Sequence, residues 1–522
     1  GSTLTTAGTW NNSGLLEVRY TSIVNLGGTF TTLEFENIQR DVVTITSNLT
    51  GTLNNAADVL TLDATTGNLN FINGTISGGT ITDDGAGRYN FSTGNGTFDN
   101  LVLDTDILVQ DNRSLSVTNG IDFGASTPTI TLGGTGSGSL RLSGNANNSI
   151  GATGTGSIVL AHTSSRIDDD GYASLTHTIG ANVSISGFGS IASNAGSSVI
   201  DNLGAISANQ SGQTLNLTRV NNSASATLEA INGATLDLNG VWNNAGTITA
   251  TDSTLTMVGT TSWTNTGTIS VLGSIPANGS TLTTAGTWNN SGLLEVRDTS
   301  IVNLGGTFTT LDFESIQRDV TTITSNLTGA LNNAADVLTL DATTGNLNFI
   351  NGTISGGTIT DDGAGRYNFS TGNGTFDAVI LDTNLLVDNN RTLNITNDLD
   401  FGASAPAITL VGTVYGRITL LNNISQSIGA TGTGSIILNH VSSLVTDQGY
   451  SGHLHTIGQN VSISGFGTVT TLTGTRFFDN LGTITADQSG LTLHLTRVNN
   501  NVVGTMSAIN SAVLSLNTFT NH

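Results

Sequence analysis

The sequence predicts an all-β chain folded as a parallel β-helix, and two repeats lead to this prediction. A short phrase returns at nearly even steps between Ile200 and Gly306, and a much longer stretch of sequence occurs twice. Convincing helical periodicity is missing, and Asn-Gly hairpin signals are few. A unit of about 20 residues cannot bury its own apolar face, so stacking on its neighbours is the natural solution.

One anchor residue per unit marks the short period. The anchors recur at nearly even, twenty-odd-residue steps: Ile200, Val220, Trp242, Trp263 and Trp288. Most are followed by a β-prone run, a polar corner and a second run such as TLNL or TLDL. Apolar residues in these runs alternate with Thr, Asp or Ser, which places one face of each strand inside the coil. We therefore predict about 20–22 residues per coil.

The long period covers more than half of the chain. Residues 1–99 recur as residues 279–377 with five differences, and beyond them the two copies drift but stay in register. This predicts two domains, residues 1–278 and an incomplete second repeat, residues 279–522, which continues the same β-helix. Neither end resembles a solenoid cap. We expect either a piece of a longer repetitive protein or a subunit whose ends stack in a filament.

Composition excludes several classes of function. The chain has 66 Gly, no Cys and no Lys, so all 14 basic residues are Arg. Disulfides, thiolate metal sites, Walker-type phosphate loops and Schiff-base chemistry are therefore excluded. The formal net charge of −23 argues against nucleic acid as a partner. No run approaches the length of about 18 apolar residues that a membrane span needs, so we expect no such segment.

Two equivalent acidic turns are the candidates for a metal site. Each holds two consecutive carboxylates before a Gly turn and an Arg: Asp83, Asp84 and Arg88 in the first copy, and Asp361, Asp362 and Arg366 in the second. Such oxygens suit Ca²⁺, the one cofactor that we consider, or a local ion pair. Asp side chains also cap the backbone of ordinary turns. We favour a solvated, capped turn.

Other polar residues are expected to be structural. The acidic run Asp168–Asp170 resembles a metal site more closely, but we predict a surface loop whose role is not kept by its counterpart, Thr446–Gln448. The histidines found in both copies lack a partner at metal-ligand spacing, which favours ordinary strand or turn positions: His162, His177, His440 and His455.

The anchors and the Thr-rich runs each admit a second interpretation. Trp and Asn at the anchors could bind sugars, but residues at one position of successive coils more often stack inside a solenoid. Outward Thr in T-x-T runs could form an ice-binding array, although Thr is also the polar residue that strands favour: Thr44–Thr46, Thr80–Thr82 and Thr247–Thr249. With only six Glu and no GxSxG elbow, we predict no catalytic residues.

The phrase W-x-N-x-G-x-I, followed by S-T-L-T-x-x-G, resembles the repetitive passenger regions of large bacterial exoproteins, namely filamentous-haemagglutinin-like and autotransporter-type adhesins. The likeness covers mainly Ile200–Gly306 and its second-copy equivalent. It implies a right-handed parallel β-helix, secretion to the cell surface, and a role in adhesion, matrix or filament building.

From this resemblance and the repeats we expect a non-enzymatic extracellular fibre. Its expected partners are further copies, end to end or side by side, and a host, matrix or carbohydrate surface. The alternative is a carbohydrate-active β-helix enzyme, either a lyase or a hydrolase. A third interpretation, an S-layer or sheath component, differs from the first only in lateral packing.

Overall fold

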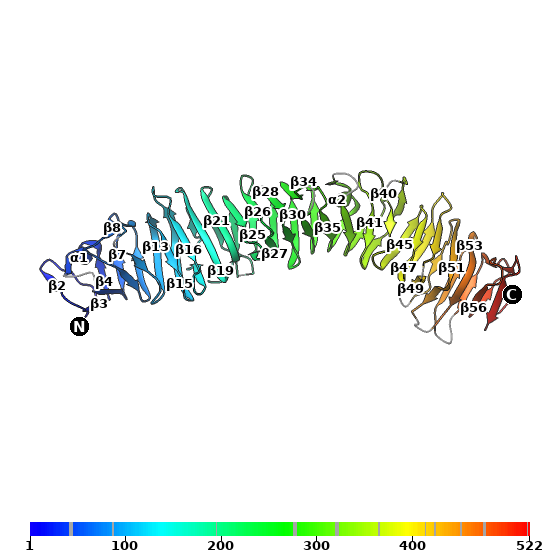
Figure 1. Cartoon of the computed structure of the whole chain (residues 1–522), viewed down its shortest axis with the longest axis horizontal. Coiled ribbons are helices and arrows are strands. Elements are labelled where there is room, and N and C mark those ends of the chain that lie inside the picture. The colour runs from blue at the N-terminus through cyan, green and yellow to red at the C-terminus, as the bar shows by residue number, and fades with distance from the viewer. Residues whose placement is uncertain are drawn as a thin grey trace. The chain divides into compact units, whose positions relative to one another are not determined.

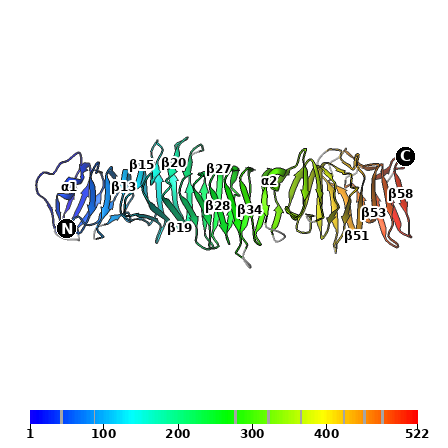
Figure 2. The ribbon, with the colours of Figure 1, turned by 90° about the horizontal axis from the view of Figure 1, so that it is seen from above.

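A computed structural model describes most of the chain: residues 1–40, 45–85, 88–194, 196–274, 279–318, 323–363, 366–412, 414–421, 424–448, 452–472, 477–518 and 520–521. It is nearly all β, with 58% strand and 2% helix, and its parallel stacked coils form a β-solenoid of about 22 turns. The predicted parallel β-helix is confirmed. Figure 1 and Figure 2 show strands of successive coils side by side within each part of the chain.

The chain forms two compact units. One is built mainly from Gly1–Ser274 and the other mainly from Leu294–His522, so the division falls near the repeat boundary seen in the sequence. Each unit has its own stack of coils and its own interior. Residue 1 of the first copy corresponds to residue 279 of the second, and this offset is constant along the chain. Every contact in one unit can therefore be compared with its counterpart in the other.

Strand pairing follows the anchors. β22 (Val199–Asn202) pairs in parallel with β25 (Val220–Asn222), which sets Ile200 opposite Val220. β27 (Thr235–Asn244) pairs with β30 (Thr260–Asn265), which sets Trp242 opposite Trp263. Because each partner lies one coil further along the chain, the strands stack instead of forming hairpins.

Coil length varies along each unit. In the anchored coils Ala205 pairs with Thr227, and Thr227 in turn pairs with Thr247, so the predicted spacing holds there. Some earlier coils are longer. Ser149 of β18 (Ser149–Ile150) pairs with Thr178 of β20 (Thr176–Ile179), which lies well beyond that spacing.

The interior is made of columns of apolar side chains. One column takes a single residue from one strand in each of five successive coils, β21 (Val183–Ala192), β23 (Ala205–Ala208), β26 (Thr227–Ala230), β28 (Thr247–Thr251) and β31 (Thr268–Leu272). Each member is at most 1% exposed: Ile185, Ile206, Leu228, Ile248 and Ile269. Burying one such side chain contributes about 1.5–3 kcal/mol.

The anchor residues stack inside the coils, as predicted. The Trp242 and Trp263 rings lie 5.2 Å apart and nearly parallel, and each is at most 2% exposed. Two residues further along each coil, buried amides form a ladder in which each Nδ2 donates to the next Oδ1, at 3.1, 2.8 and 2.7 Å: Asn202, Asn222, Asn244 and Asn265. Sugar binding by these rings is excluded by their burial.

Within the described part of the chain, two one-turn helices interrupt the strands, and the sequence patterns did not predict them. They are α1 (Thr32–Glu36) and α2 (Thr310–Glu314). Each begins with a capping box, in which Thr31 or Thr309 caps the first turn and the third helical residue reaches back to it. The Thr31-x-x-Glu34 spacing was a readable signal, but a single turn carries no apolar periodicity.

Candidate functional site

The acidic turns are capped turns. Asp83 ends β11 (Thr80–Asp83); its Oδ1 accepts from the Gly85 backbone N–H at 2.8 Å and its Oδ2 accepts from the Thr105 hydroxyl. Arg88 lies 3.6 Å from the same carboxylate, so the predicted ion pair is present. Both carboxylate oxygens therefore have protein donors.

The second copy builds the same turn. Asp361 accepts from Gly363 at 2.9 Å and from the Thr383 hydroxyl. The neighbouring acidic residues, Asp84 and Asp362, each follow the end of a strand. Their backbone N–H groups donate to the backbone carbonyls of Leu62 and Leu340, both at 3.1 Å. Within the described ranges, no three His, Cys, Asp or Glu side chains are grouped so as to hold a metal ion.

The run Asp168–Asp170 corrects a prediction. Two of its members are not in a surface loop but in the last two positions of the long strand β19 (Gly156–Asp169), where Asp168 is 7% exposed and Asp169 is 4% exposed. Arg166 pairs with Asp168 at 2.7 Å. Arg141, on the preceding coil, lies 3.3 Å from Asp168 and 3.4 Å from Asp170.

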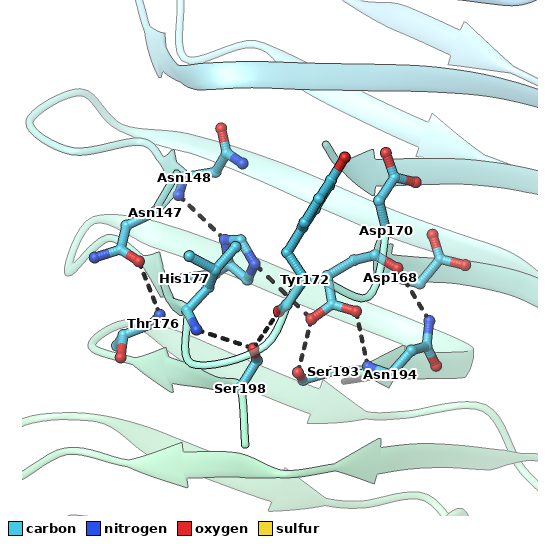
Figure 3. Close-up of polar contacts among 12 residues, drawn as sticks. Asn147, Asn148, Asp168, Asp170, Tyr172, Thr176, His177, Ser193, Asn194 and Ser198 are labelled. Carbon is cyan, nitrogen blue, oxygen red and sulfur yellow. Dashed lines mark hydrogen bonds and ion pairs between the residues drawn. The ribbon is translucent and has the colours of Figure 1, made fainter. Parts of the chain in front are cut away.

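Asp169 belongs to a buried polar cluster, which Figure 3 shows. Its carboxylate accepts from the Ser193 hydroxyl at 2.7 Å and from the Asn194 backbone N–H at 2.8 Å, both on the next coil. His177 Nε2 lies 3.9 Å from the same carboxylate, and its ring is fully buried. His177 Nδ1 accepts from the Asn148 backbone N–H at 3.1 Å. The cluster thus joins three successive coils.

The cluster is not arranged for nucleophilic catalysis. A Ser–His–Asp triad needs a hydroxyl that donates to the imidazole, whereas Ser193 donates to the carboxylate. Because Nδ1 of His177 accepts a hydrogen bond, the ring proton is on Nε2, which faces Asp169. Burial lowers the pKa of His177, although Asp169 acts in the opposite direction. The neutral, buried imidazole and the hydrogen-bonded carboxylate therefore connect adjacent coils inside the stack. We call this pair, Asp169 and His177, the Asp–His clamp.

The second copy keeps this clamp, contrary to the sequence-based expectation. Asp447 and His455 are fully buried, and His455 Nε2 lies 3.7 Å from Asp447 Oδ2. Asp447 accepts from the Leu472 backbone N–H at 2.8 Å, as Asp169 does from Asn194. The supports differ, because Gln426 replaces Asn148 and Thr471 replaces Ser193, and both ring nitrogens of His455 lie buried without a hydrogen bond from any described residue.

Inter-coil clamping is a recurrent use of Asp in this chain. Asp104 accepts from the Ser126 backbone N–H at 2.7 Å, and Asp122 accepts from Gly154 at 2.8 Å. Burial acts to raise the pKa of Asp122, but hydrogen bonds from Thr153 and Gly154 outweigh it and lower that pKa. A short side chain suits this contact, and 31 of the 37 acidic residues are Asp. Sequence reasoning missed the clamps because donor and acceptor are separated by a whole coil.

The remaining candidates occupy ordinary positions. His162 lies in β19 and its Nδ1 accepts from the Ser164 backbone N–H at 3.1 Å; His440 makes the same contact with Ser442 at 3.0 Å. Among the T-x-T runs, Thr44 lies outside the described residues. Thr247 and Thr249 are not part of an array made of Thr alone, because Glu229 lies beside Thr249 on the preceding coil.

The comparisons with known proteins do not extend these observations. Neither the scan against models of known protein families nor the search of curated proteins finds a match for the chain. Among the helices of the described residues, none is long and apolar enough to cross a bilayer. The function is therefore argued from the geometry.

Proposed function

We propose that the chain is a non-enzymatic structural or adhesive element of an extracellular fibre, built from tandem β-helical repeats. The proposal rests on the contacts between coils that the two copies share. Both keep the parallel coils, the Asn ladders and the Asp–His clamp, all of which hold one coil to the next. The contacts retained are those that a fibre requires.

The acidic side chains support the same proposal. Catalysis by paired carboxylates needs two such groups facing a substrate, whereas Asp83, Asp122 and Asp169 are engaged by donors of the protein itself. A net charge of −23 also suits a fibre, because like-charged surfaces repel and limit uncontrolled bundling. We place the fibre at a cell surface, where further copies and a host, matrix or carbohydrate surface are its partners.

Negative-stain electron microscopy of the intact protein tests the proposal. We expect long rods or filaments, with lateral bundles that increase as added NaCl screens the acidic surface. Compact, isolated particles at every salt concentration would contradict the proposal. Hydrolysis or eliminative cleavage of a polysaccharide by the purified protein would favour the enzyme alternative instead.

A further inference from the structure

The second unit carries a groove on the outside of its stack. It crosses four successive coils, at β41 (Leu347–Phe349), β44 (Tyr367–Asn368), β46 (Leu385–Val387) and β48 (Ala407–Leu410). Its lining includes six outward-facing side chains: Arg366, Asn368, Asn384, Leu386, Asp388 and Thr409. The floor is fixed, because the Tyr367 ring is buried and its hydroxyl donates to the Leu338 carbonyl at 2.8 Å.

A change of coil length accounts for the hollow. In the first copy the equivalent strands β12 (Tyr89–Asn90) and β14 (Ile107–Val109) pair Asn90 with Leu108. This coil is several residues shorter than the next one, in which Leu108 pairs with Thr131. The second copy repeats the longer coil, since Leu386 pairs with Thr409. A short coil has a smaller perimeter than its neighbours, so the wall is recessed there.

The polar groups of the groove are set to meet a ligand rich in hydroxyls. Asn384 Oδ1 accepts from the Ala407 backbone N–H at 2.8 Å, which orients its amide. Asp388 Oδ2 accepts from Asn389 at 2.9 Å, but its Oδ1 is buried without a hydrogen bond from any described residue. A buried, unpaired acceptor is costly, and a turn of the Asp388 side chain that brings Oδ1 to the groove would let a ligand donor satisfy it. Arg366 and the half-exposed Leu386 add a fork of donors and an apolar strip.

We propose that this groove binds a neutral oligosaccharide lying along the axis of the second unit. Planar amide, carboxylate and guanidinium groups can each bridge neighbouring hydroxyls of a sugar. Strand spacing of about 4.8 Å makes four coils span about 14 Å, the length of about three sugar residues. A peptide that adds as a β-strand needs an open sheet edge, and the walls here are strands already paired with the coils on either side.

Charge favours a neutral ligand and binding without hydrolysis. The chain carries a net charge of −23, and Asp388 faces the groove, so an anionic polymer would be repelled. Glycoside hydrolysis uses a pair of carboxylates; among the lining residues of the described part, Asp388 is the one carboxylate. This inference specifies one partner that the fibre proposal names, a carbohydrate surface, but it rests on the groove, so a filament seen in micrographs would neither support nor weaken it.

The first copy supplies a matched control. It keeps Arg88, Asn90, Leu108 and Thr131 at the equivalent positions, but Gln110 stands where the second copy has Asp388. The acidic residue is instead Asp106, at the position of Asn384, and it accepts from the Thr129 backbone N–H at 2.8 Å. The polar lining of the groove therefore differs from the equivalent positions of the first copy by two side chains, with the charge exchanged between them.

Isothermal titration calorimetry on the intact protein tests the inference with four probes: cellohexaose, maltohexaose, chitohexaose and hexagalacturonate. We expect at least one of the three neutral hexamers to bind at one site per chain and the galacturonate not to bind. D388Q, which copies the first unit, should weaken that binding at least tenfold with an unchanged melting temperature.

A gain-of-function variant provides the second arm. The double substitution Q110D and D106N gives the first unit the polar lining of the second, and we expect the stoichiometry to rise towards two. The inference is overturned if no neutral hexamer binds at 10 mM, if hexagalacturonate is the preferred ligand, or if D388Q binds as tightly as the wild type.

Discussion

The two copies differ most instructively in the coils that follow residue 100. In the first copy, four charged side chains form an ion-pair network around β19, which we call the surface network because three of them are at least partly exposed and only Asp168 is buried. In the second copy all four positions are neutral: Arg141, Arg166, Asp168 and Asp170 correspond to Thr419, Leu444, Thr446 and Gln448. Two residues inside the same coils, Asp169 and His177, are kept as Asp447 and His455. The mostly exposed network was exchanged as a unit, whereas the buried Asp–His contact was retained.

Solvation explains this difference. Partly exposed ion pairs contribute about 1 kcal/mol or less, so losing all four charges together costs little. A buried carboxylate is different, because removing it leaves its donors unsatisfied at about 1–3 kcal/mol. Replacing only one member of the surface network would leave another charge unpaired. This cost is consistent with the replacement of all four residues together.

The largest effect expected is at the buried carboxylate. Asp169→Ala leaves the Ser193 hydroxyl and the Asn194 N–H without an acceptor, so we expect a loss of about 2 kcal/mol in local stability. Asp447→Ala should cost a similar amount in the second copy. Hydrogen exchange of β19–β21 and of the equivalent strands β51 (Gly434–Asp447) to β53 (Val461–Thr470) measures both.

The surface network provides the control for that prediction. The quadruple variant R141T/R166L/D168T/D170Q converts the first copy to the second, and we expect exchange protection of β19 to change by about 1 kcal/mol or less. A loss as large as that of Asp169→Ala would show that exposure does not separate the two kinds of contact.

A smaller effect is expected where the copies differ in the interior. Asn148 Oδ1 accepts from Gly120 N–H at 3.0 Å and its Nδ2 donates to the Ser143 carbonyl at 3.0 Å. Gln426 is 2% exposed, and both polar atoms of its side chain lie buried without a hydrogen bond from any residue that the structure describes. We expect Asn148→Gln to destabilise the first unit and Gln426→Asn to stabilise the second, each by about 1 kcal/mol.

Urea unfolding followed by hydrogen exchange of β20 and of β52 (Leu454–Ile457) measures the reciprocal pair. Opposite signs for the two substitutions would support the comparison. If Gln426→Asn also destabilises, the extra methylene of Gln fills space that the second unit requires.

Much of the architecture could be predicted from the sequence, because both periods are visible as repeated residues. The Trp and Asn anchors recur at coil spacing, and stacking is the arrangement that buries them. The Asp–His clamp was missed because three consecutive Asp residues usually indicate a loop. A signal did exist: between the copies Asp168 and Asp170 change, while Asp169 and His177 do not.

The groove could not be predicted, because it arises from a difference in coil length. Strand runs can be recognised in the sequence, but the residue on the next coil that pairs with each run cannot. Pairing Asn90 with Leu108 makes a coil shorter than the one that follows it, in which Leu108 pairs with Thr131. A coil that is shorter by a few residues has no distinctive amino-acid composition. The recess can therefore be recognised only when the pairing of successive coils is known.

The pH dependence of the first unit gives a further, smaller test. Burial lowers the pKa of His177 in the folded chain, so the unfolded state takes up a proton at a higher pH than the folded state. Stability is therefore full above the unfolded value of about 6.5 and declines as the pH falls below it. We expect exchange protection of β20 to fall between pH 7 and pH 5, and His177→Gln to remove this part of the dependence.

The acidic clamps titrate in a separate window. Hydrogen bonds hold the pKa of Asp122 and of Asp400 below the ordinary value, against the opposing effect of burial. Their contribution is present above about pH 4 and is lost as the pH falls through the folded pKa. Loss of protection at β20 that begins only below pH 4 would contradict the role assigned to His177.

The smallest effect is expected from chelation, and it should be the same in both copies. Ca²⁺ takes six to eight oxygen ligands, but the carboxylate oxygens of Asp83 and Asp361 already accept hydrogen bonds from the turn and from the next coil. We expect 5 mM EDTA to leave the melting temperature unchanged within about 1 °C. If EDTA lowers it, Asp83→Asn and Asp361→Asn would identify the responsible turn, since an amide keeps one acceptor but loses the charge that attracts the ion.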